Sequence, residues 1–181
     1  AQRRAVLPGI RKHLLYYPNS SIYTIGDEMR YVEYRYVGGR RKHHISAVTA
    51  SESLELLFRQ ASQGITINEM IDLLVDDEVS REEAAAFIDD VLNAQMLVNE
   101  LEPAITGDEF IYQVIRVLQR IHGVAPQEGT STVISLLQQV NERLQGIDSA
   151  TANIAADYRG ISALLDQLGV PYEENKLFQT D

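Results

Sequence analysis

Residues 31–48, YVEYRYVGGRRKHHISAV, decide the fold of this 181-residue chain. Tyrosine and valine dominate residues 31–37, a composition typical of a β-strand. Gly38-Gly39 follows, and both glycines accept the positive φ angles that a tight hairpin turn requires. Residues 41–48 return as the next strand. Together with the β-branched stretch at 21–26, these residues predict an antiparallel sheet of three sequential strands.

A helical pattern replaces the strand pattern after residue 50. Residues 51–62 place apolar side chains at helical spacing behind a serine N-cap. Thr66 with Glu69, and Ser80 with Glu83, match the capping-box pattern, which predicts a short helix through residue 75 and a longer one to about residue 97. Three strands beside a helix-turn-helix predict an α+β fold, namely a winged helix-turn-helix over residues 20–101.

Two segments flank this predicted unit. Residues 1–19 are expected to form an N-terminal lead-in. Residues 102–181 are expected to form a helical extension, with helices at 108–121, 130–145 and 151–167 and a strand cut in mid-run at 177–181. Because the sequence also starts without a methionine, we expect both ends to be cut from a longer protein.

Composition narrows the class of protein. Hydrophobic residues make up 45% of the chain, which is enough for a packed core. The chain has no cysteine, which excludes disulfides and thiolate metal sites and fits the cytoplasm. No run of eighteen apolar residues is present, so the sequence predicts no membrane span.

Charge is unevenly distributed along the chain. Residues 1–49 hold nine Lys or Arg against three Asp or Glu, whereas the remaining residues hold seven against twenty-three. A basic sheet is therefore joined to an acidic helical body. This contrast indicates a partner on the basic part, packing between the two parts, or simply two differently solvated faces.

Candidate chemical groups do not form a catalytic pattern in the sequence. His43 and His44 are neighbours on a predicted strand, so their side chains point to opposite faces and cannot share one metal ion. Gly38-Gly39 lacks the following helix that a phosphate-binding loop needs. The carboxylates at 76–78 and 89–90 fall in a turn and on a helix surface. The sequence therefore predicts no metal site and no active site.

The helix-turn-helix raises the question of DNA binding. A recognition helix needs basic or amide side chains near its N-terminal end. The helix that starts after Ser80 offers Arg81, but four acidic residues follow between positions 82 and 90, and phosphates would repel them. The basic residues 40–42 remain available for phosphate. DNA is therefore a less favoured ligand, and a winged-helix DNA-binding regulator stays the alternative.

The third strand suggests a peptide ligand instead. In a sheet of three sequential strands, residues 41–48 lie at an edge, where an extended peptide can add as a fourth strand. The long helix is expected to supply the opposite wall, although most of its apolar residues must belong to the core. Basic residues at this edge favour an acidic peptide. The predicted peptide-binding residues are Arg41, Lys42, His43, His44, Ile45, Ser46, Ala47, Val48, Ala84, Phe87, Ile88, Val91, Leu92 and Gln95.

An ordered series of segments also carries a family likeness. The series comprises RYVEYRY at 30–36, GRRKHHISAV at 39–48, IDLL at 71–74, EEA at 82–84, and QMLVNELEP at 95–103 with Thr106-Gly107. It resembles the N-terminal domain of class I lantibiotic dehydratases. The likeness covers most of the chain, and it is most specific over residues 30–107.

This resemblance implies a function. Members of the family take glutamate from glutamyl-tRNA, esterify Ser and Thr of a precursor peptide, and eliminate glutamate to leave dehydroalanine or dehydrobutyrine. Their leader-peptide recognition element is a winged helix-turn-helix, in which the leader adds beside the third strand and against the third helix. By resemblance, that groove falls on Arg41–Val48 and Ser80–Leu97.

The resemblance also implies the partners of the parent protein. These are the precursor leader peptide, the remaining domains of the dehydratase, glutamyl-tRNA as co-substrate, and a complex with a cyclase. It implies a glutamylation role for Asp181, but one isolated carboxylate catalyses nothing recognisable. We therefore expect this chain alone to be inactive and to bind no cofactor. A catalytic domain that transfers glutamate by itself is a further alternative.

Overall fold

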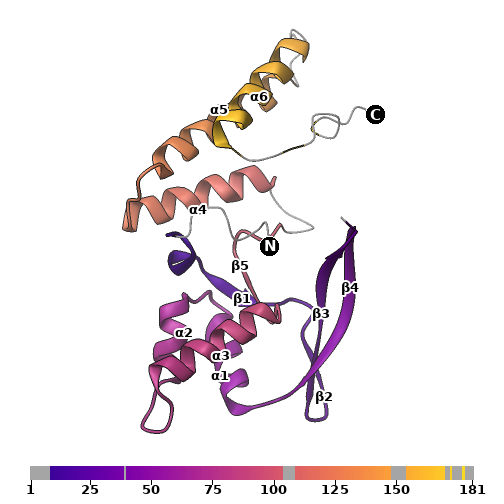
Figure 1. Cartoon of the computed structure of the whole chain (residues 1–181), viewed down its shortest axis with the longest axis vertical. Coiled ribbons are helices and arrows are strands. Elements are labelled where there is room, and N and C mark those ends of the chain that lie inside the picture. Colours follow the sequence, from indigo (N-terminus) through magenta and orange to yellow (C-terminus); the bar gives the residue numbers. More distant parts are fainter. Residues whose placement is uncertain are drawn as a thin grey trace. The chain divides into compact units, whose positions relative to one another are not determined.

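The structure is a computed structural model that describes residues 9–38, 40–103, 109–147 and 154–169, with Tyr172 and Leu177. The chain divides into two compact units, Ala1–Glu102 and Pro103–Asp181 (Figure 1). Among the helices in these ranges, none has both the length and the apolarity needed to cross a bilayer.

An antiparallel sheet of three strands forms part of the first unit. Its strands are, in spatial order, β2 (Tyr23–Ile25), β3 (Glu28–Val37) and β4 (Arg40–Thr49). Gly26 and Gly38 adopt positive φ angles of 62° and 59° in the two connecting turns, where a β-carbon would be strained. All ten residues of β3 pair with the ten of β4. The predicted three-stranded antiparallel sheet is therefore confirmed.

Three helices follow the sheet along the chain: α1 (Glu52–Ala61), α2 (Ile67–Leu74) and α3 (Arg81–Asn93). Both predicted capping boxes are present, with Thr66 and Ser80 as the N-caps of α2 and α3. The side chain of Ser51 caps α1 by accepting from the Leu54 N–H. Local capping chemistry therefore sets the start of each helix.

The core of this unit is built from side chains of the helices and of one face of β3. On β3 the buried side chains alternate, because successive residues of a strand point to opposite faces. They are Met29, Tyr31 and Glu33. The helices contribute Leu57, Met70 and Ile88, each with at most 1% of its surface exposed. Burial of such side chains contributes about 1.5–3 kcal/mol each.

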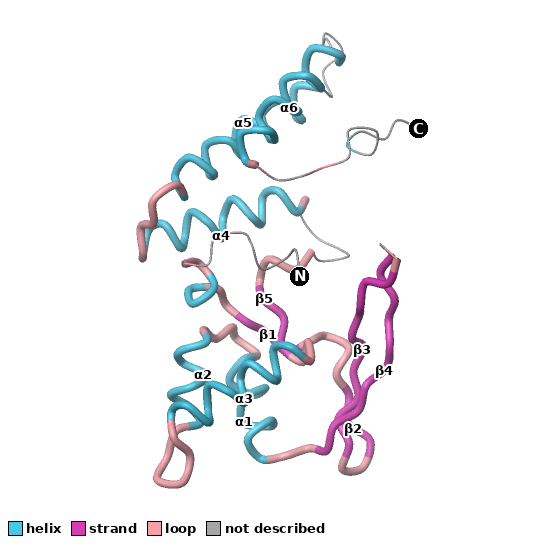
Figure 2. Tube along the Cα trace, viewed as in Figure 1, coloured by secondary structure: helices cyan, strands magenta, loops and turns pink. Residues whose placement is uncertain are grey.

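A second, two-stranded sheet was not predicted from the sequence. It pairs β1 (Tyr16–Pro18) with β5 (Leu97–Asn99) in antiparallel orientation (Figure 2). Before β1 lies a short 3₁₀ helix, Arg11–His13. The predicted lead-in thus contributes a strand to the first unit, and strand β5 begins where the third helix was expected to end.

The second unit consists of helices α4 (Phe110–Val124), α5 (Thr130–Ile147) and α6 (Ile154–Leu168). Their predicted positions agree to within a few residues. A buried cluster joins α5 to α6 through Leu136, Val140, Ile161 and Leu164. The predicted strand at 177–181 lies, apart from Leu177, outside the described residues. The chain is therefore a mixed α and β structure, as the predicted α+β class requires.

Candidate functional site

Strand β4 forms one edge of the three-stranded sheet. Within the described part of the chain it pairs with β3 alone. Its side chains are exposed or half-buried along its whole length, and Ile45 is 71% exposed. The eight predicted residues Arg41–Val48 all lie on this strand. The structure therefore brings them together as a continuous open edge ten residues long.

Backbone groups alternate in direction along this edge. On β3, the N–H groups of Val32 and Tyr34 donate to side chains on the side away from β4. In an antiparallel pair, the intervening residues of β3 must then bond to β4. Ile45 and His43 pair with Val32 and Tyr34, so their backbone N–H and C=O groups also point away from the partner strand. Ala47 and Arg41, two residues to either side on β4, point the same way. These groups match what an added strand requires.

Side chains of β4 divide between the two faces of the sheet. Lys42, His44, Ser46 and Val48 lie opposite Arg35, Glu33, Tyr31 and Met29, so they share the face that carries the core. Arg41, His43, Ile45 and Ala47 share the other face. His43 and His44 therefore project to opposite sides of the sheet.

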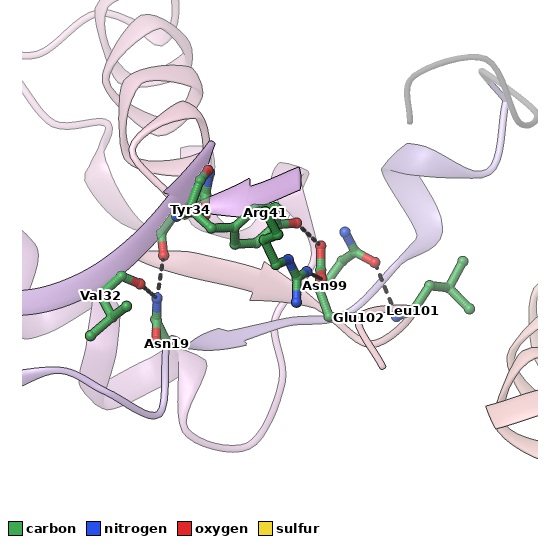
Figure 3. Close-up of polar contacts among 8 residues, drawn as sticks. Asn19, Val32, Tyr34, Arg41, Asn99, Leu101 and Glu102 are labelled. Atoms are coloured by element: carbon green, nitrogen blue, oxygen red, sulfur yellow. Dashed lines mark hydrogen bonds and ion pairs between the residues drawn. The ribbon is translucent and has the colours of Figure 1, made fainter. Parts of the chain in front are cut away.

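Arg41 is held in place on the outer face. Its guanidinium carbon lies 3.7 Å from the centre of the Tyr34 ring, and its Nη2 lies 3.9 Å from Glu102 Oε2 (Figure 3). The Tyr34 hydroxyl donates to Glu102 Oε1 at 3.4 Å. The ring and the carboxylate orient the guanidinium, whose side chain still has 40% of its surface exposed.

The predicted residues of α3 divide into two groups. Ala84, Ile88 and Val91 are at most 4% exposed, so they hold α3 in the core and present no surface to a ligand. Phe87 and Leu92 are half-buried and keep part of their surface accessible. The α3 residues that remain candidates for peptide contact are therefore these two.

Gln95 lies beyond the end of α3, and its side chain forms hydrogen bonds with β3. Its side chain bonds the backbone of Tyr34 on the side of β3 opposite β4. This position separates it from the outward-facing groups of β4. We therefore exclude Gln95 from the candidate peptide-contact surface.

An open hollow of about 530 Å³ lies elsewhere, between the end of α1 and α2. Its lining is Gln60, Gln63, Gly64, Ile65, Glu69, Asp72 and Leu73. None of these residues belongs to β4 or α3. The candidate site is therefore the exposed edge of β4, with Phe87 and Leu92 of α3 as further candidate side chains, and its recognition groups are mainly backbone amides and carbonyls.

Two carboxylates of the first unit have a lowered pKa because they take part in helix capping. Hydrogen bonds from Ser80 lower the pKa of Glu83, and those from Thr66 lower the pKa of Glu69. Burial raises the pKa of Tyr31, and the nearby Glu33 carboxylate acts in the same direction.

Asp181, the predicted glutamylation carboxylate, lies outside the described residues.

Comparison with known proteins identifies the family of this chain of mixed α and β structure. Residues 2–181 match the family model described as "Lantibiotic dehydratase, N terminus". The chain belongs to this family, as its ordered sequence segments predicted. No curated protein matches the chain.

The fold is also similar to a solved structure, that of the tRNA-dependent lantibiotic dehydratase MibB from Microbispora sp. 107891. The TM-score is 0.60 at 13% sequence identity, over 91% of this chain. The chain spans 16% of the length of MibB. At this identity the similarity shows a shared fold.

Proposed function

We propose that this chain is part of a cytoplasmic lantibiotic dehydratase and that β4 binds the leader of its precursor peptide. Family membership supports the dehydratase role. The observation that carries the binding role is the open edge of β4, where alternate residues from Arg41 to Ala47 direct their backbone groups outward. A leader that adds there gains backbone hydrogen bonds along its length.

Element order supports the winged-helix interpretation of this unit. Three antiparallel strands precede three helices, and α3 follows α2 after a short turn. The wall opposite the leader is then the exposed part of α3, near Phe87 and Leu92. Affinity comes from the strand edge, and side-chain contacts with α3 add selectivity.

Charge at the end of the hairpin favours an acidic leader. Arg35 is 70% exposed. The exposed residue Lys42 pairs with it across the two strands, and the exposed residue Arg40 pairs with Val37 at the end of the hairpin. Glu33 is the one carboxylate in residues 31–49, and it bonds Arg35. A net positive edge attracts acidic peptides and repels basic ones.

In this proposal the parent enzyme performs the chemistry. It transfers glutamate from glutamyl-tRNA to a Ser or Thr hydroxyl of the bound precursor, which releases the tRNA and leaves a glutamyl ester. Elimination of glutamate, with loss of the α-proton, leaves dehydroalanine or dehydrobutyrine. A cyclase then consumes the dehydrated peptide. The present chain contributes recognition, which raises the local concentration of precursor.

Titration with a fluorescein-labelled synthetic leader tests the binding role. The leader is that of the precursor encoded in the same gene cluster, and a scrambled peptide of equal composition is the control. We expect saturable binding of the leader alone, measured by fluorescence anisotropy. Absence of saturation with folded protein contradicts the proposal. Tight, salt-dependent binding of duplex DNA would favour the winged-helix regulator instead.

A further inference from the structure

The turn that ends α3 contains an unexpected residue. Gln95 has a φ angle of 60°, and no other non-glycine residue in the described ranges has a positive φ. Its N–H donates to the Leu92 carbonyl, and the Met96 N–H donates to the Val91 carbonyl, both at 3.1 Å. This is a Schellman motif, in which glycine is usual at the left-handed position. A residue with a β-carbon costs roughly 1–2 kcal/mol there, so contacts of the glutamine side chain must offset that strain.

These contacts are two reciprocal hydrogen bonds with β3. Gln95 Nε2 donates to the Tyr34 carbonyl at 2.8 Å, and the Tyr34 N–H donates to Gln95 Oε1 at 3.0 Å. A neighbouring strand would make the same two bonds to a hydrogen-bonded residue. The glutamine amide therefore takes the place of one strand residue beside β3.

The next residue of β3 that points its backbone groups to this side, Val32, is also bonded by side chains. Asn19 Nδ2 donates to the Val32 carbonyl at 3.0 Å (Figure 3). The Val32 N–H donates to Ser21 Oγ at 2.9 Å. Asn19 Nδ2 also donates to the Gln95 carbonyl at 2.9 Å. Strand β2 pairs with only the first three residues of β3. Side chains therefore occupy this edge beyond the end of β2.

We infer that Gln95 is a positioning residue that closes the inner edge of β3 and directs strand addition to β4. Without its amide, the N–H and C=O of Tyr34 would form a second open edge. The same contact ties the end of α3 to the sheet, which sets the wall of the groove relative to β4. The claim that Gln95 directs the leader to β4, here called edge selection, rests on the proposed function. The claim that Gln95 closes the edge of β3 at Tyr34 does not rest on it.

Amide hydrogen exchange of the ¹⁵N-labelled chain tests the closure without any ligand. Gln95→Gly relaxes the turn but removes the amide, and we expect exchange at Tyr34 to become at least tenfold faster. The Tyr31 amide, which bonds β4, stays protected in the same variant and shows that the sheet is folded. Gln63→Gly, at an exposed position, is the matched control. Unchanged exchange at Tyr34 in Gln95→Gly would overturn the inference.

A conservative variant separates this role from a general packing role. Gln95→Glu keeps the acceptor for the Tyr34 N–H and loses the donor. We therefore expect exchange at Tyr34 to slow, relative to Gln95→Gly, by at least threefold. Equal exchange in the two variants would show that the side-chain oxygen does not close this edge.

Amide exchange in the presence of saturating leader tests edge selection. In the unchanged chain we expect the leader to slow exchange at His43 and Ile45 and to leave exchange at Tyr34 unchanged. In Gln95→Gly, the leader is expected to slow exchange at Tyr34 as well. Slowing confined to β4 in both proteins would overturn edge selection. If the unchanged chain binds no leader, the proposed function fails, and the exchange measurement still decides whether Gln95 closes β3.

Discussion

The guanidinium carbon of Arg41 lies 3.7 Å from the centre of the Tyr34 ring, on a diagonal between strands β4 and β3. The contact places a cation against an aromatic face on the exposed side of the sheet. It fixes a basic side chain close to the outward-facing backbone of β4. The hairpin therefore has an ordered surface at this position before any ligand binds.

This contact predicts different effects for two substitutions of Tyr34. Tyr34→Leu removes the ring and its edge-to-face contact with Tyr36, and we expect the free energy of unfolding to fall by about 1–2 kcal/mol. Tyr34→Phe keeps the ring and removes the long hydrogen bond to Glu102, so we expect a loss of about 0.5 kcal/mol or less. Urea denaturation measures both. Equal losses would show that the ring contributes nothing beyond the hydroxyl.

Packing at Leu57 predicts a large cost of truncation. This side chain is 0% exposed in the first unit. We expect Leu57→Ala to lower the free energy of unfolding by about 2–5 kcal/mol, because the cavity adds to the lost burial. Ile25→Thr, at a position that is 53% exposed, is the control and should cost about 0.5 kcal/mol or less. Similar losses in denaturant titrations would contradict the assigned core.

Glu69 predicts a loss of stability in acid. Its pKa is lowered by hydrogen bonds from the Thr66 N–H and hydroxyl, at 2.8 and 2.7 Å. A carboxyl whose pKa is lower in the folded state stabilises the fold above its unfolded pKa of about 4.3, and this contribution disappears as pH falls through the folded value.

Glu69→Gln should therefore lower the free energy of unfolding at pH 7 by a few tenths of a kcal/mol, since solvent screens this exposed group. At about pH 2 the difference between the two proteins should vanish. Glu78→Gln, in the exposed turn before α3, is the control for the removal of one carboxylate at pH 7. A difference that persists in acid would rule out the charged capping box as its source.

Basic residues at the hairpin predict salt-dependent leader binding. We expect the double substitution Arg40→Gln and Lys42→Gln to weaken leader affinity by roughly three- to tenfold at low salt, and by less at 0.5 M salt. Arg59→Gln removes an exposed charge from α1 instead and is the control. Anisotropy titrations at two salt concentrations measure the effect. An equal loss in the control would assign it to overall charge.

Local chemistry made much of the fold predictable. The strands of the hairpin, its glycine turn and the helix starts follow from contacts between residues close in sequence. Thr66 with Glu69 and Ser80 with Glu83 are such cases, and both capping boxes were predicted correctly.

Long-range pairing was not predictable in the same way. Strand β1 is three residues long, and its partner β5 lies about eighty residues away, so neither has a recognisable local pattern. The early end of α3 also escaped prediction, because a glutamine occupies a position where glycine is the usual signal. Its stabilising partner, Tyr34, lies sixty-one residues earlier in the chain.

The candidate site was predictable in its strand and only partly in its helix. Order along the chain and the hairpin turn place residues 41–48 at an edge. Helical periodicity identifies an apolar face on α3 but does not separate buried Ile88 from half-buried Phe87, since both lie on that face. That distinction depends on tertiary packing.

One substitution tests the central claim most directly. The N–H of Ile45 points away from β3, so Ile45→Pro removes an outward-facing donor while leaving the pairing with β3 intact, as proline is tolerated on edge strands. Ile45→Thr keeps the N–H and is the matched control. If the leader adds as a strand, Ile45→Pro lowers its affinity at least tenfold, about 1.4 kcal/mol, and Ile45→Thr changes it less than threefold. Unchanged affinity in folded Ile45→Pro would contradict strand addition at β4.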